Sequence, residues 1–115
     1  MKQYTINGTT VQLKKGLYET NDTLYVGLDS LSDGGRFPYM HLTTNLPDAV
    51  FPANAKLQYV KIGMDCGVDR VQFLEENGIA EDVGILACSG FNVYTLMDFS
   101  GSLDDMRDLN ASRRA

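Results

Sequence analysis

The sequence contains few of the residues from which catalytic and metal centres are usually built. Its 115 residues include two cysteines, Cys66 and Cys88, and one histidine, His41. Two cysteines are too few for a disulfide framework, and in a reducing compartment we expect both to be free thiols. No pair among the three residues has the close spacing of a zinc site. We therefore predict no metal, no cofactor and no catalytic residue.

The sequence also lacks long apolar runs. No segment approaches the roughly 20 apolar residues of a membrane helix, and the N-terminal "MKQYTINGTT" has no apolar stretch of the kind found in signal peptides. Hydrophobic residues make up 43% and charged residues 22%, which is typical of a globular domain. These features predict one domain in a cytoplasmic protein.

Basic residues are scarce in the second half of the chain. Residues 65–108 contain ten acidic side chains against two arginines, a net charge of −8 within a total of −5. Phosphate contacts need lysine and arginine, so this half argues against direct nucleic-acid binding. It is compatible with binding to a basic protein surface.

Alternating apolar residues predict strands over much of the chain. In "QYTINGTTVQL" the Asn7-Gly8 pair suits a two-residue type I′ turn, which would set Tyr4 opposite Val11. Further strands are predicted around 24–28, 36–46 and 56–62, with a final strand pair within 83–99 that has a turn or a bulge at Ser89-Gly90. Pro38 lacks an amide donor and therefore belongs at a sheet edge or near a strand start.

The segment "KIGMDCGVDRVQFLEENGI" predicts the one helix, over about 66–77. Asp65 is the expected N-cap, Val68, Val71 and Leu74 form an apolar stripe, and Gly78 suits the left-handed position after the last turn. Cys66 would then lie at the helix start, as a small residue without a special role.

Together these elements predict an α+β fold, in which a mostly antiparallel, curled sheet of five to seven strands packs on one short helix. Residues 1–99 would form the single domain, and residues 100–115 a polar, partly flexible tail that starts at most a short helix near Ser102. The predicted core consists of Ile6, Val11, Leu13, Leu24, Val26, Leu28, Leu42, Leu57, Val68, Val71, Leu74, Ile85 and Val93.

Three stretches resemble a known family. They are "YETNDTLYVGLDSLSDGGRFPYMHLTTNLP", the acidic helix ending "LEENGI", and "CSGFNVYTLM". The similar proteins are small, uncharacterised (a domain of unknown function), and often encoded on conjugative elements and phages of Gram-positive bacteria. The resemblance covers roughly residues 1–99 and leaves the tail outside. It implies accessory cargo of mobile DNA, which often antagonises host defences, and it brings no catalytic residues.

The acidic helix is the most informative candidate for function. On helical spacing Asp69, Phe73 and Glu76 fall on the side away from the apolar stripe. An exposed aromatic ring framed by carboxylates is typical of a protein-binding patch. The expected partner-binding residues are Asp69, Phe73, Glu75, Glu76, Glu81 and Asp82. A merely solvated acidic face, with Phe73 covered by a loop, is the simpler alternative.

Three hypotheses follow. The first is a non-enzymatic binding protein that inhibits a host defence nuclease, of the anti-CRISPR or anti-restriction type, by occupying its nucleic-acid groove as a DNA mimic. The second is a structural module whose edge strands, around Pro38 or in the C-terminal hairpin, pair with another copy or another protein. The third is an enzyme that uses Cys66 with His41 as its base.

Overall fold

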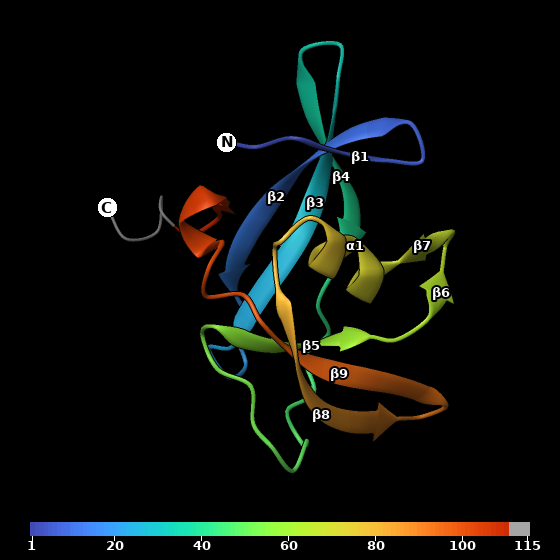
Figure 1. Ribbon diagram of the computed structural model, residues 1–115. Helices are drawn as coiled ribbons and strands as arrows, with labels where there is room; N and C mark the ends of the chain where they lie inside the picture. Colours follow the sequence, from blue (N-terminus) through green and yellow to red (C-terminus); the bar gives the residue numbers. More distant parts are fainter. Residues whose placement is uncertain (111–115) are drawn as a thin grey trace.

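The computed structural model describes residues 1–110 and arranges them as two main open sheets, one small two-stranded sheet and one short helix that lies between the main sheets (Figure 1). Sheet A contains β1 (Tyr4–Ile6), β2 (Thr9–Leu17), β3 (Leu24–Ser32) and β4 (Gly35–His41), antiparallel and in that order. A short C-terminal strand, β10 (Arg107–Asp108), pairs parallel with β2.

Sheet B has the order β5-β9-β8 and is antiparallel throughout. Its strands are β5 (Leu57–Lys61), β8 (Glu81–Ser89) and β9 (Asn92–Asp98). Between β5 and β8 the chain forms a small hairpin of β6 (Met64–Asp65) and β7 (Val68–Asp69), then the helix α1 (Arg70–Glu76). A 3₁₀ turn, η1 (Leu103–Asp105), precedes β10.

The predicted α+β class and single curled sheet are wrong. Strands account for 51% of the structure and helical turns for 9%, so the protein is mostly β with one short helix, and neither sheet closes. The helix begins at Arg70, not 66, because Cys66 (φ 53°) and Gly67 (φ 76°) both adopt left-handed angles. That geometry is a two-residue hairpin turn, so Asp65 lies in a strand and Cys66 lies at a turn.

The predicted N-terminal hairpin is confirmed. Tyr4 pairs with Val11, and Asn7 and Gly8 both have positive φ, as a type I′ turn requires. The same turn chemistry recurs at Asp33-Gly34, between β3 and β4. Pro38 lies in β4, which is an edge of sheet A, as its missing amide predicted.

The main core fills the space between sheet A, α1 and one face of sheet B. Most predicted core residues are buried there, although Leu57, Val71 and Ile85 are only partly buried and Val93 is exposed. A second cluster on the other face of sheet B is built on Tyr59, Tyr94 and Leu96 and is covered by the loop around Leu46–Ala53. The sequence pattern did not predict that sheet B is covered on both faces.

The polar tail is part of the packed structure as far as Asn110. Met106 is buried in the main core, and the Leu109 amide donates to the Lys15 carbonyl at 2.8 Å. The Asn110 side chain accepts from the Leu17 amide at 3.2 Å. The expected short helix near Ser102 is the single 3₁₀ turn η1. The flexibility predicted beyond Asn110 lies outside the described residues.

Within residues 1–110, no helix is long and apolar enough to cross a membrane.

Candidate functional site

The ends of α1 are fixed by the residues on either side of it. The Asp69 side chain accepts from the Gln72 amide at 3.0 Å and is therefore the N-cap, the role that the sequence had suggested for Asp65. After Asn77 the chain turns at Gly78 (φ 66°), and the Ile79 amide donates to the Leu74 carbonyl at 2.9 Å. Ile79 is buried, so the predicted C-terminal stop is confirmed.

This stop directs the chain into β8 and gathers carboxylates at the C-terminal end of α1. Glu75, Glu81, Asp82 and Asp98 line one cleft of about 430 Å³, together with backbone around Gly78 and Ser100. We call it the Glu75 cleft. No lysine or arginine of the described chain lines it. Three of the predicted binding residues meet here, and Asp98 joins them from the end of β9.

The four carboxylates of the Glu75 cleft have different surroundings. Asp82 accepts from the Thr95 hydroxyl at 2.6 Å and the Gly84 amide at 2.8 Å. Hydrogen bonds from Ser100, the backbone amide first, hold the pKa of Asp98 below its usual range. Within the described chain, the side-chain carboxylates of Glu75 and Glu81 have no hydrogen-bond or ion-pair partner. These two carboxylates are therefore available to an incoming cation.

The other predicted residues lie along a second cleft. Asp69, Phe73 and Glu76 line a cleft of about 290 Å³ between α1 and the turn at Asn7. Glu76 accepts from the Gln72 side chain at 2.7 Å, and Asp69 is occupied as the N-cap. The six predicted residues thus divide into two groups of three, one group on each cleft.

The prediction of an exposed Phe73 anchor is wrong. Phe73 is only 8% exposed and belongs to the main core, where its ring meets Tyr4 edge-on with centroids 5.9 Å apart. The helix is shorter than predicted and begins four residues later, so its buried face centres on Phe73 and Leu74, while Val71 is only partly buried. The α1 region therefore presents carboxylates at the surface, without an exposed aromatic ring.

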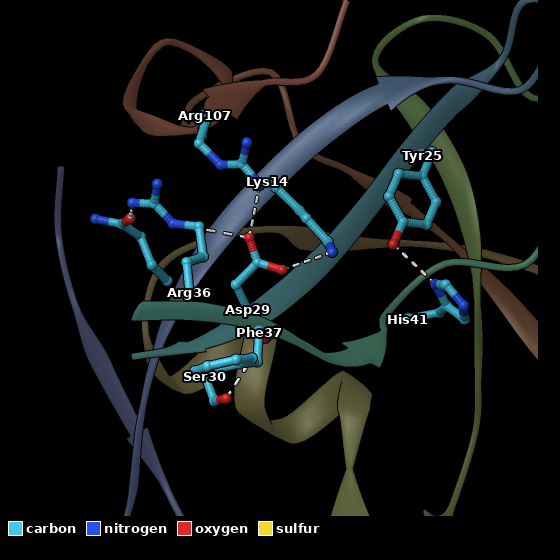
Figure 2. Close-up of polar contacts among 9 residues, drawn as sticks. Lys14, Tyr25, Asp29, Ser30, Arg36, Phe37, His41 and Arg107 are labelled. Atoms are coloured by element: carbon cyan, nitrogen blue, oxygen red, sulfur yellow. Dashed lines mark hydrogen bonds and ion pairs between the residues drawn. The ribbon is translucent and has the colours of Figure 1, made fainter. Parts of the chain in front are cut away.

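A separate polar cluster covers the outer face of sheet A (Figure 2). Asp29 of β3, with a side chain only 3% exposed, accepts from Lys14 at 2.6 Å and from Arg107 at 2.7 Å, and Arg36 lies 3.8 Å away. Burial alone would raise the pKa of Asp29, but the hydrogen bonds and positive charges of Lys14 and Arg107 outweigh it and lower the pKa. The cluster carries a net positive charge on the face that does not cover the core.

The cysteine and histidine residues do not form a recognisable centre. His41 Nδ1 is hydrogen-bonded to the Tyr25 hydroxyl at 2.8 Å on the outer face of sheet A (Figure 2). Burial first, then the nearby Tyr18 and Asp29, raise the pKa of Tyr25 to about 12. Cys66 lies in the β6–β7 turn, with Sγ 3.8 Å from Asp65 Oδ1, and Cys88 is exposed on β8. Within residues 1–110, no group of three or more histidine, cysteine or acidic residues is placed to hold a metal ion.

The fold and the site thus define a small, mostly β protein with two open sheets, an acidic cleft beside its one helix and a basic cluster on the outer face of sheet A. Residues 10–113 match the family described as Domain of unknown function (DUF4313), and the chain belongs to this family. The match includes most of the polar tail, which the resemblance at the sequence level had left outside. No curated protein matches the chain, and no solved structure matches it.

Proposed function

We propose that this protein is a non-enzymatic binding protein whose acidic surface, centred on the Glu75 cleft, docks onto a basic surface of another protein. The observation that carries the proposal is the convergence of Glu75, Glu81, Asp82 and Asp98 on one cleft that no lysine or arginine of the described chain lines. The charge of Lys56 acts on Asp98 from outside this lining. Charge of one sign in a concave site focuses the electrostatic field and raises the association rate of an oppositely charged partner.

The two unpartnered carboxylates give this surface a defined way to recognise a partner. An arginine or lysine side chain that enters the cleft would meet Glu75 and Glu81, which have no competing partner in the described chain. Hydrogen bonds between a guanidinium and a carboxylate are among the strongest polar contacts between proteins. Asp82 and Asp98 are held by hydrogen bonds of their own and supply fixed negative charge at the wall of the cleft.

The partner class follows from the setting that the resemblance implies. An accessory protein of a conjugative element or phage benefits from blocking a host nuclease that attacks incoming DNA. The nucleic-acid groove of such a nuclease is basic, because it binds phosphates through lysine and arginine. We propose that the acidic surface occupies this groove as a DNA mimic, in the manner of an anti-CRISPR or anti-restriction protein.

A transfer assay tests this function. Expressing the protein in a host with its DNA-targeting nucleases intact should raise the uptake of unmodified foreign DNA. The double variant Glu75→Lys/Glu81→Lys should lose this effect, because it reverses two charges that support no internal contact. The matched control Asp48→Lys reverses an exposed charge in a loop outside the cleft and should behave as wild type. Uptake that does not respond to the wild-type protein would contradict the proposal.

A further inference from the structure

The outer strands β4 of sheet A and β8 of sheet B form edges of different character. The β4 edge of sheet A carries Arg36, Pro38 and a bulge opposite Leu28 and Asp29, all of which discourage pairing with another strand. The β8 edge of sheet B, "EDVGILACS", has nine residues and no lysine, arginine or proline. Its irregular pairing is confined to the stretch between Asp82 and Leu86, and Leu86–Ser89 is regular. Within β8, the second half is therefore the unprotected part of the edge.

The backbone of this half-strand has groups available for a further ladder. The two-residue turn closes on the pair Ser89 and Asn92, which in such hairpins is a hydrogen-bonded pair. Hydrogen-bonded and non-hydrogen-bonded pairs alternate along an antiparallel ladder, so the amide and carbonyl groups of Leu86 and Cys88 point away from β9. Apart from β9, no segment within residues 1–110 forms a backbone hydrogen bond with Leu86–Ser89.

The side chains on one face of this edge are apolar and uncovered. Leu86 is 63% exposed, and Val93, which is paired with Cys88 across the ladder, is 39% exposed. Ile62 continues the row, since its amide donates to the Val93 carbonyl at 2.9 Å, and it too is exposed. This face is continuous with the face of sheet B that carries Val60 in the main core. The core-facing side of sheet B thus continues beyond the main core as an exposed apolar strip, which consists of Leu86, Cys88, Val93 and Ile62.

We propose that the β8 edge pairs antiparallel with the β8 edge of a second copy of this chain, about a twofold axis at Ala87, and joins two sheets B into one sheet of six strands. In this register Leu86 of each copy lies opposite Cys88 of the other, so the groups that point away from β9 pair with each other. The apolar strips of the two copies lie on the same face of the joined sheet.

The charge pattern of β8 favours a second copy as the occupant. Glu81 and Asp82 occupy one end of β8, and Leu86–Ser89 carries no charge. Antiparallel pairing about Ala87 places the acidic ends of the two copies at opposite ends of the seam, so no like charges face each other. The uncharged half-strand is therefore complementary to itself. This inference is independent of the proposed function, because the seam does not use Glu75 and leaves the Glu75 cleft to a different partner.

Sedimentation of the purified protein over a concentration series tests the pairing. The wild type should approach twice the 12.7 kDa mass of the chain, and high salt should not dissociate it, because the contact is apolar and hydrogen-bonded. Leu86→Lys places a charge on the strip at an already exposed position and should shift the protein to the monomer. The matched control Phe37→Lys makes the same kind of change on the β4 edge and should leave the dimer intact.

Amide hydrogen exchange locates the contact without a variant. In the wild-type protein, protection of the Leu86 and Cys88 amides should increase with concentration, together with the mass. A protein that stays monomeric at all concentrations would overturn the proposal. A dimer in which these two amides remain unprotected would overturn it equally, as would protection that appears only when a foreign protein is added.

Discussion

At the scale of single residues, Asp29 is the charged group on which most of the outer face of sheet A depends. One buried carboxylate joins Lys14 of β2 and Arg107 of β10, with Arg36 of β4 nearby, and so ties three strands to β3. Removing one partner of a buried ion pair is costly, because the remaining charge loses its compensation. Lys14, whose side chain is almost as buried as Asp29, would bear most of that cost.

Replacing Asp29 should therefore destabilise the protein and change its response to acid. Asp29→Ala should lower the free energy of unfolding by about 3 kcal/mol or more at neutral pH. The pKa of Asp29 is lower in the folded than in the unfolded chain, so its stabilisation is fully present above the ordinary value of 3.8 and is lost as the pH falls through the folded value. Urea denaturation from neutral to acid pH should show a shallower acid loss in Asp29→Asn than in wild type. Equal acid losses would contradict this account of the cluster.

Gly27 has a steric role that the sequence does not indicate. A Cβ at this position would overlap the hydroxyl oxygen of Tyr25, whose ring lies across Gly27 to reach His41. Gly27→Ala should break this contact and cost about 1–3 kcal/mol in thermal or urea denaturation. Gly101→Ala, where a Cβ meets open space, is the control and should change stability by less than about 1 kcal/mol. Similar values for the two variants would rule out the steric role.

At the scale of elements, local signals identified the turns better than they identified the helix start. The Asn7-Gly8 pair is enough to predict its hairpin turn, because few other residue pairs accept two positive φ angles. Cys66-Gly67 adopts the same turn, but cysteine gives no such signal, and Asp65 resembles an N-cap as closely as Asp69 does. Packing determines that Asp69 and not Asp65 is the N-cap, because it places Phe73 and Leu74 in the core. The prediction that Phe73 is exposed is wrong because the same packing buries its ring.

A hairpin turn at Cys66 and a helix start at Cys66 predict different effects of the substitution Cys66→Asn on stability. Asparagine tolerates the left-handed conformation far better than cysteine. Cys66→Asn should therefore raise the free energy of unfolding by about 0.5–1 kcal/mol, measured from the denaturation midpoint. If Cys66 instead began the helix, asparagine would be neutral or slightly destabilising. A lowered midpoint would argue for the helix start.

At the scale of the whole molecule, the sequence predicted most of the strands but not their assembly. Periodicity places Leu24, Val26 and Leu28 on one face of a strand. It does not indicate which strands pair with each other or to which sheet each strand belongs. The division into two sheets depends on long-range pairings, and the C-terminal strand β10 joins β2 from the far end of the chain. A polar segment such as 100–110 looks like a tail because its few apolar residues, Met106 above all, show no period. The sequence predicted the acidic composition of this half of the chain but no cleft, because the cleft depends on the fold that brings Asp98 close to Glu75.

The packed tail can be tested through Met106. This side chain is buried in the main core, so Met106→Ala should cost about 2–5 kcal/mol in urea denaturation. Met64→Ala, the same change at an exposed position on β6, should stay within about 0.5 kcal/mol of wild type. If both variants lost little and equal stability, the domain boundary predicted at residue 99 would be correct after all.

The most direct test of the acidic binding surface is capture of partners from a lysate of the host at low and at high salt, with identification by mass spectrometry. The account predicts that the wild-type protein captures a basic nucleic-acid-binding protein at low salt only, since exposed charges are screened as salt rises. Glu75→Lys/Glu81→Lys should lose this partner and Asp48→Lys should keep it. A partner retained by the double variant and at high salt would contradict the account, and so would a lysate from which the protein recovers only itself.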